Sequence, residues 1–132
     1  MAYLVNYPAA ARRHLSAADR LKPTDRRDVA GYLYGIAAEC AIKAMMRDAG
    51  LRPTGRRDGN DPFYAHFPEL KTLLRDTLGS RRLPTLTAYT QSEAFMKNWA
   101  IRMRYSNGRD ITDRWVSRWA TDANQAVSSI GT

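Results

Sequence analysis

The sequence predicts an all-α domain, an up-and-down antiparallel bundle of four to five helices. Apolar residues recur at three- and four-residue steps along most of the chain, which is the period of a helix that buries one face. No stretch shows the alternation of apolar and polar residues that is typical of a strand. With 132 residues, of which 44% are hydrophobic, the chain has the size of one domain, and we expect a single helical domain over residues 1–132.

The first two helices are predicted from their ends as well as from their period. Residues 9–21 follow Pro8, which suits a first helical turn. A longer helix begins after a cap at Thr24 or Asp25 and stops before Gly50. The apolar stripe that this helix is expected to bury consists of Val29, Leu33, Ile36, Ala37, Cys40 and Ala44.

Three further helices are expected after a long loop. Residues 51–65 contain two prolines and two glycines, and a loop of this length in a compact domain is typical of functional segments. A third helix is predicted over residues 66–78, and a fourth starts at residue 86 or 92 and ends at residue 105. Thr112 is expected to cap the last one.

The chain is strongly basic. Its net charge at pH 7 is +8, from 21 Lys and Arg against 13 Asp and Glu. Such an excess attracts polyanions or an acidic protein partner, although a solvated arginine-rich surface explains it equally well. Arginine pairs recur at Arg12-Arg13, Arg26-Arg27, Arg56-Arg57 and Arg81-Arg82.

Several classes of protein are disfavoured by the sequence. No run approaches 18 uncharged apolar residues, and the N-terminus lacks the pattern of a signal peptide, so we expect a cytoplasmic protein without a membrane segment. A single cysteine, Cys40, leaves no disulfide framework. No metal-binding pattern and no cofactor motif occurs, and neither a metal nor a cofactor is expected.

Polar residues follow one edge of the apolar stripe on the second helix: Asp28, Tyr32, Glu39, Lys43 and Arg47. Glu39 and Lys43 are four residues apart, in the order that favours an ion pair on an exposed helix. These charges could form a solvated pair, or they could lie at the margin of a groove or an interface.

Two arginines of the fourth predicted helix have different orientations. A helical projection places Arg102 on the apolar face with Phe95 and Trp99, whereas Arg104 points away from it. Arg102 could stack on a tryptophan and pair with Glu39 across the bundle, or it could offer its donors to phosphate in a cleft.

Three short motifs, in this order, resemble a HEPN domain. Ala38-Glu39-Cys40-Ala41-Ile42-Lys43 is similar to the second helix of that family, in which a Glu, three residues and a Lys recur. His66-Phe67-Pro68-Glu69-Leu70 is similar to the His-x-x-x-Leu opening of a later helix, and Arg104-Tyr105-Ser106 resembles the Arg-Tyr-Pro that closes another. The resemblance covers residues 9–129. It implies a small helical bundle, often dimeric, of prokaryotic defence, toxin-antitoxin or nucleotidyltransferase-linked systems.

The chain departs from the ribonucleases of that family. They carry an Arg followed, after four to six residues, by a His, and cut RNA without a metal. Neither His14 nor His66 follows an arginine at this spacing. The resemblance therefore implies a module that binds RNA or nucleotide and is non-catalytic or atypical. Two alternatives stay open: an active metal-independent ribonuclease toxin that uses Arg104, His66 and Glu39, and an interaction module for an acidic antitoxin or a nucleotidyltransferase partner.

Residues for nucleic-acid binding are expected in basic loops and at helix ends, where a guanidinium group can meet phosphate. The expected set is Arg104, Tyr105, Asn107, Lys43, Arg47, Arg56, Arg57, Arg81 and Arg82. A homodimer is also expected, because three Trp, seven Tyr and three Phe are many large apolar groups for one small core.

Overall fold

The computed structural model describes residues 2–54 and 59–132, and over these residues it contains helices and no strand. The predicted all-α class is therefore confirmed. No helix in the described part is both long and apolar enough to cross a membrane. The elements are α1 (Tyr7–Leu21), α2 (Arg27–Asp48), η1 (Pro62–Tyr64), α3 (Glu69–Leu78), α4 (Pro84–Gln91), η2 (Ile101–Tyr105) and α5 (Asp113–Ser128), of which η1 and η2 are short 3-10 helices.

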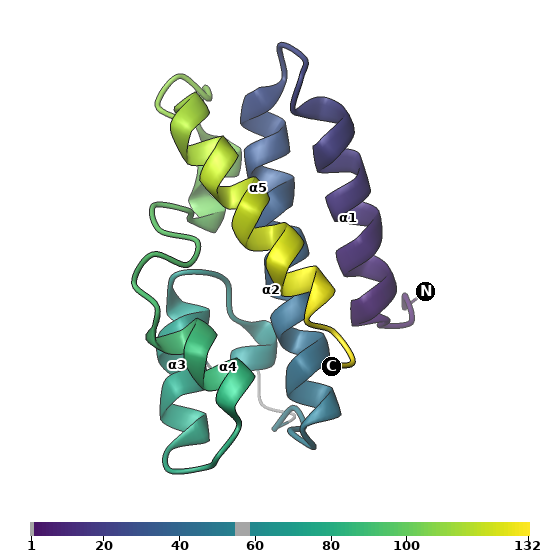
Figure 1. The fold of residues 1–132 in the computed structure, drawn as a ribbon, viewed down its shortest axis with the longest axis vertical. Helices are drawn as coiled ribbons and strands as arrows, with labels where there is room; N and C mark the ends of the chain where they lie inside the picture. The colour runs from purple at the N-terminus through teal and green to yellow at the C-terminus, as the bar shows by residue number, and fades with distance from the viewer. Residues whose placement is uncertain (1, 55–58) are drawn as a thin grey trace.

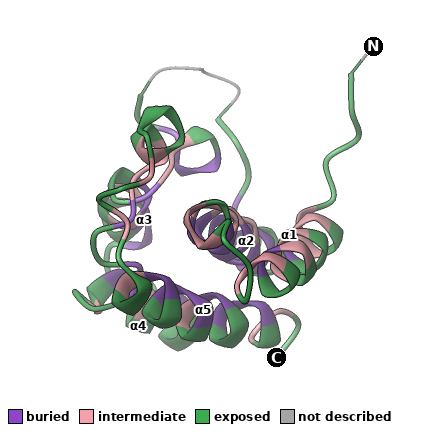
Figure 2. Cartoon of the chain, turned by 90° about the horizontal axis from the view of Figure 1, so that it is seen from above, coloured by how far each residue is buried: buried purple, intermediate pink, exposed green. Residues whose placement is uncertain are grey.

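The long helix α2 lies in the middle of the molecule (Figures 1 and 2). α1 lies along one side of it, and α5 crosses it, while α3 and α4 pack against each other near its C-terminal half. Figure 2 shows that the buried sides of α2, α3 and α5 face one another. The buried face of α2 is rich in small residues and includes Ala30, Tyr34, Ala38, Ala41, Ile42 and Met45.

The predicted core stripe of α2 is wrong in part. Val29 is 39% exposed, and Leu33, Ile36 and Cys40 are only partly buried. Neighbouring helices approach α2 on the face that carries alanines and glycines, because small side chains let two helices come close. A helix that is contacted on several sides does not show one clear apolar stripe in its sequence.

Two glycines of α2 form the site on which two tryptophans pack. Trp99 Nε1 donates a hydrogen bond to the carbonyl oxygen of Gly31 at 3.0 Å, and Gly35 lies against the same indole. A Cβ atom at Gly31 would come within 2.9 Å of Trp119 Cζ3. The four-residue spacing places both glycines on one face of α2, so this face receives aromatic rings from two later segments.

The predicted fourth helix is wrong in its second half. Helix α4 ends at residue 91, and Met96 and Asn98 then adopt positive φ angles of 54° and 72°, which an α-helix does not allow. The backbone of this segment bonds to α5 instead. Met96 N–H donates to Asp122 Oδ2 at 2.9 Å, and the carbonyl of Lys97 accepts from Trp119 Nε1 at 2.9 Å. Tertiary hydrogen bonds thus replace those of a helix.

Two charged side chains of α3 hold the end of α4 and the segment after it. Lys71 Nζ donates to the carbonyl oxygens of Ser92 and Phe95, and Arg75 donates to that of Thr90 at 2.6 Å. The last carbonyl groups of a helix have no partner within the helix, so these contacts satisfy them. They also fix the position of Phe95 between α3 and α5.

The helix ends are predicted with mixed success. Thr112 caps α5 as expected, since its Oγ1 accepts the N–H of Trp115 at 3.1 Å. α1 starts two residues before the predicted helix, because Asn6 caps it. The predicted cap of α2 is wrong: α2 begins at Arg27, and its N-cap residue Arg26 makes no side-chain cap bond.

Candidate functional site

Glu39 and His66, which the sequence singles out separately, meet in the structure. Glu39 Oε1 lies 2.8 Å from His66 Nδ1, and Glu39 Oε2 accepts the N–H of Phe67 at 2.8 Å. Glu39 is 3% exposed, whereas the side chain of His66 is 41% exposed. His66 precedes α3 and does not begin a helix, because α3 starts at Glu69. The result is an exposed imidazole whose orientation is set by a buried carboxylate.

Burial dominates the electrostatics of this carboxylate. Desolvation raises the pKa of Glu39, and the hydrogen bond with His66 and the charge of Lys43 oppose that rise. Lys43 is also buried, which lowers its pKa, while the nearby Glu39 opposes that change. Of the two predicted alternatives, the solvated pair of Glu39 and Lys43 is therefore wrong, because both side chains are buried. The burial of Lys43 also argues against the expected contact with nucleic acid.

Arg102 and Arg104 are both exposed. The predicted position of Arg102 in the apolar face is wrong, because the helix that the projection assumed does not form. The alternative in which Arg102 pairs with Glu39 depended on that position and is wrong as well. The outward orientation predicted for Arg104 is confirmed. Its guanidinium lies 4.9 Å from the ring centre of Tyr105, and a side-chain hydrogen bond with Tyr32 is the main cause that raises its pKa.

The three candidate catalytic residues do not form one site. Arg104 interacts with Tyr32, which precedes Glu39 by seven residues, or roughly 10 Å, along α2. Glu39 in turn holds His66. The structure therefore joins two of the three residues and leaves Arg104 two helical turns away along α2.

The turn after η2 uses its polar groups internally. Arg109 N–H donates to Asn107 Oδ1 at 2.9 Å, and Gly108 N–H donates to Ser106 Oγ at 3.2 Å. Tyr105, next to this turn, is 76% exposed. Asn107 thus shapes the turn, and Tyr105 is the large side chain that the turn presents to solvent.

Several other expected binding residues lie at the opposite end of the molecule. Arg47 is near the C-terminus of α2, and Arg81 and Arg82 are in the loop between α3 and α4, so all three are at the lower end in Figure 1. All three are exposed. Arg56 and Arg57 lie outside the described residues.

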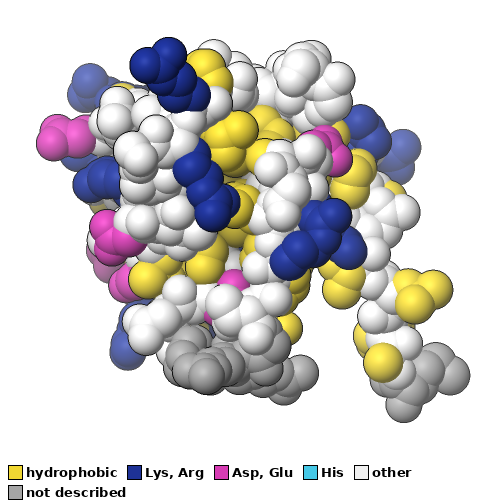
Figure 3. All heavy atoms as spheres, turned by 90° about the horizontal axis from the view of Figure 1, so that it is seen from below, with side chains coloured by type: hydrophobic (Ala, Val, Ile, Leu, Met, Phe, Trp, Pro, Cys, Tyr) yellow, Lys and Arg dark blue, Asp and Glu magenta, His cyan; other side chains and the backbone are white. Residues whose placement is uncertain are grey.

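Arg52, which is absent from the expected binding set, belongs to the same region. Its Nη1 donates to the carbonyl oxygens of Arg47 and Leu51, at 3.1 and 2.8 Å. A basic residue just after a helix commonly binds the last carbonyl groups, and this signal could have identified Arg52. We call Arg47, Arg52, Arg81 and Arg82 the basic end. Seen from this side, Lys and Arg side chains lie beside a band of hydrophobic surface, and Asp and Glu side chains lie on the same face (Figure 3).

None of the four arginines of the basic end forms an ion pair with a carboxylate in the described part of the chain. Among the described residues, Arg26 forms an ion pair with Asp28, and Arg27 forms one with Asp113. Both pairs lie near the start of α2, far from the basic end. Arg47 stands over the ring of Tyr7, with 5.8 Å to its centroid.

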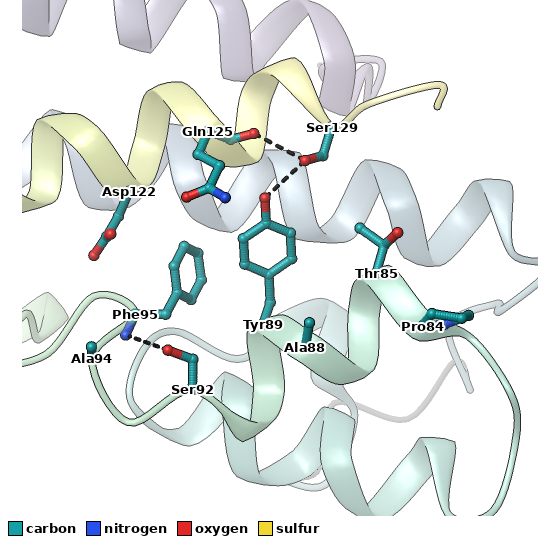
Figure 4. A pocket seen from close by; sticks show the side chains of 10 residues that line it. All are labelled: Pro84, Thr85, Ala88, Tyr89, Ser92, Ala94, Phe95, Asp122, Gln125 and Ser129. Atoms are coloured by element: carbon teal, nitrogen blue, oxygen red, sulfur yellow. Dashed lines mark hydrogen bonds between the residues drawn. The ribbon is translucent and has the colours of Figure 1, made fainter.

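A hollow that sequence reasoning missed lies between α4 and α5 (Figure 4). It measures about 480 Å³, and Tyr89, Phe95, Asp122, Gln125 and Ser129 are among its lining residues. These residues are up to 40 positions apart in the sequence, and no motif connects them. Among residues 2–54 and 59–132, no cluster of three or more His, Cys, Asp or Glu could hold a metal ion.

No protein-family model, no curated protein and no solved structure matches this chain. Similarity to HEPN domains therefore rests on the three motifs of the sequence. The helical fold, the contact between Glu39 and His66, the basic end and the hollow beside α4 are observed independently of that similarity.

Proposed function

We propose that the chain is a HEPN-like, up-and-down antiparallel helical module of a prokaryotic defence or toxin-antitoxin system, and that it binds RNA through the basic end without cutting it. The basic end carries this proposal: four exposed arginines share one end of the molecule, and none forms an ion pair with a described carboxylate. Flexible guanidinium groups without acidic partners bind phosphate oxygens, and the released counterions favour association.

The arrangement of Glu39 and His66 supports binding rather than cleavage. Both carboxylate oxygens of Glu39 have fixed partners, one of them the backbone N–H of Phe67, so Glu39 fastens the segment before α3 to α2. Metal-independent cleavage needs a cation beside the imidazole to stabilise the charged transition state. Arg104, the expected cation, is two helical turns away along α2. The alternative of a ribonuclease toxin therefore has less support.

The alternative of an interaction module uses the same surface. An acidic antitoxin or an acidic face of a nucleotidyltransferase would also be attracted to the basic end. RNA is favoured because Arg81 and Arg82 stand on the loop between α3 and α4, where they can adapt to the spacing of phosphates. Competition would separate the two, since RNA and an acidic protein cannot occupy one surface together.

The proposal includes a homodimer. Two apolar surfaces are uncovered in the described chain. Residues 3–5, a tyrosine, a leucine and a valine, are 92%, 98% and 61% exposed, and the stripe of α2 that contains Val29 and Leu33 is only partly buried. Uncovered apolar surfaces of this kind are typical of interfaces. Light scattering at tens of micromolar should detect a dimer that Leu33→Asp abolishes; a wild-type monomer would contradict this part of the proposal.

The test of RNA binding is retention of labelled RNA at two ionic strengths, with cleavage scored in the same samples. Retention should fall steeply as the salt concentration rises. It should depend little on the nucleotide sequence of the RNA, because phosphate contacts carry no sequence information. The double variant Arg81→Glu/Arg82→Glu should lose most retention. The matched control is Arg12→Glu/Arg13→Glu, which changes the net charge equally on exposed positions of α1. Equal retention of RNA by the two variants would reject the basic end as the binding surface. If the wild type cleaves RNA and His66→Ala abolishes the cleavage, the chain is a ribonuclease and the proposal of binding without cutting is rejected.

A further inference from the structure

The hollow between α4 and α5 has the size and the lining of a site for one planar ring. Small-ligand sites measure a few hundred Å³, and this hollow measures about 480 Å³. Its apolar lining includes the rings of Tyr89 and Phe95, whose centroids are 4.7 Å apart. Aromatic side chains bind flat heterocycles by stacking.

The fixed hydrogen bonds in the hollow leave mainly acceptors for a ligand. Ser129 Oγ lies 3.0 Å from the carbonyl oxygen of Gln125, to which it can only donate, and in that arrangement Tyr89 donates the 2.8 Å bond between the two hydroxyl groups. Both protons are therefore used, and the two oxygens offer lone pairs. Figure 4 shows both bonds.

Asp122 adds a carboxylate to these acceptors. Its Oδ2 accepts the N–H of Met96 at 2.9 Å, and no hydrogen bond to its Oδ1 is formed by the described residues. The amide of Gln125, which can donate and accept, lies on the same side of the hollow in Figure 4. A ligand that suits this lining must bring N–H donors.

The two ends of the hollow differ in charge. Asp122 stands at one end, and Pro84 and Thr85 stand at the other (Figure 4). Arg81 and Arg82 precede Pro84 in the chain and are exposed. Arg82 is two residues and Arg81 three residues from Pro84, so their Cα atoms lie within about 7 and 11 Å of that of Pro84. The preferred ligand therefore has donors at one end and negative charge at the other.

We propose that this hollow binds a nucleobase with an exocyclic amino group, whose phosphate is held by Arg81 and Arg82. The amino group of adenine, cytosine or guanine donates to Asp122, and the ring packs on Tyr89 and Phe95. Uracil has no amino group and would place its carbonyl oxygens against acceptors. The inference rests on the proposed binding of RNA and adds a base preference to it, because an unstacked base of single-stranded RNA can enter such a site.

A cationic peptide is the competing ligand. A lysine or arginine side chain would also satisfy Asp122, but the rest of a basic peptide would meet Arg81 and Arg82 at the other end of the hollow and a chain with a net charge of +8. Like charges at that end disfavour it. The nucleotide is favoured because its charge matches both ends.

The experiment titrates the full chain with the 5′-monophosphates of cytidine and uridine, followed by calorimetry or by protein NMR. Cytidine monophosphate should bind about tenfold more tightly than uridine monophosphate, the effect of one hydrogen bond to a charged group. Asp122→Asn should reduce this ratio to about threefold or less, while Asp110→Asn, an exposed carboxylate outside the hollow, should leave it unchanged. Equal binding of the two nucleotides by the wild type, or an unchanged ratio in Asp122→Asn, would overturn the proposal.

A second variant shows whether a changed preference reflects the site or a loss of folding. Asn at position 122 can still accept the N–H of Met96, and thermal melting will check that the variant folds. Ala88→Phe fills the hollow from an exposed position of α4 and should remove the preference for cytidine monophosphate without changing the carboxylate. An unchanged preference in a folded Ala88→Phe would also overturn the site.

Nucleosides separate this inference from the proposed function, because cytidine and uridine carry no phosphate. If the protein binds cytidine more tightly than uridine, and this preference is lost in Asp122→Asn, the base site is supported even when no RNA is retained. If RNA is retained through Arg81 and Arg82 but cytidine and uridine bind alike, the base site is rejected and the proposed function stands. Binding of a lysine-rich peptide that depends on Asp122, without binding of cytidine, would reject the nucleobase as the ligand.

Discussion

Gly35 of α2 lies directly against the indole of Trp99: a Cβ atom at position 35 would overlap Cε2 of that ring. The same indole stacks on Tyr32 with 6.1 Å between ring centres. Trp99 is 1% exposed and belongs to the irregular segment between α4 and α5. The contact with Gly35 therefore ties that segment to the central helix.

Substitution of Gly35 should damage the fold. Gly35→Ala forces the buried ring or the helix to move, and we expect a loss of about 3 kcal/mol or more in the free energy of unfolding, at the upper end of overpacking effects. Urea denaturation would measure it. Gly59→Ala is the control, since nothing lies within 4 Å of a Cβ atom there, and it should change stability little. A tolerated Gly35→Ala would mean that Trp99 packs elsewhere.

The carboxylate of Glu39 should matter more to stability than the ring of His66. Glu39→Ala leaves the N–H of Phe67 without an acceptor and the buried Lys43 without its nearby negative charge, at a cost of about 2 to 4 kcal/mol. Glu39→Gln keeps an acceptor and should cost less. His66→Ala, at an exposed side chain, should cost about 1 kcal/mol. Thermal melts of the three variants test this order, and a larger loss in His66→Ala would contradict it.

Arg102 and Arg104 should both be dispensable for stability. The helical projection places Arg102 in the core, but the structure exposes both side chains. Each change to Ala should therefore alter the free energy of unfolding by no more than about 0.5 kcal/mol. Denaturation of the two variants would check this, with Trp99→Ala as a strongly destabilised reference. A large loss of stability in Arg102→Ala would instead support the predicted helix, in which Arg102 lies on the apolar face.

The stability effect of Asp122 should depend on pH. Burial raises the pKa of Asp122, and the N–H of Met96 and the charges of Arg118 and Lys71 oppose the rise. Because the folded pKa is above the unfolded one, the unfolded chain loses its proton first as pH increases, and stability falls between these two values. Asp122→Asn removes this loss. Its melting temperature relative to the wild type should therefore be higher at pH 7 than at pH 3, and the opposite trend would mean that burial does not dominate the pKa of this carboxyl group.

The sequence predicted the helical class, the end of α1 and the cap of α5 because these depend on local signals. The apolar period, Pro8 and the hydroxyl of Thr112 act within one or two helical turns, and they operate whatever else the chain does. The charge excess that leads to the basic end is likewise a property of composition. Glu39 and His66 were both selected by their motifs.

The tertiary structure decided where these parts meet. Residues 92–105 have a helical apolar pattern, yet this segment finds better partners outside its own backbone. Asp122 accepts a hydrogen bond from it, Trp119 donates one to it, and the glycine face of α2 accepts one from Trp99. The contact between Glu39 and His66 spans 27 residues, and that between Tyr89 and Ser129 spans 40. Contacts over such distances depend on how the helices pack, because side chains that are remote in sequence are brought together by the burial of apolar surface and not by any local preference of the backbone.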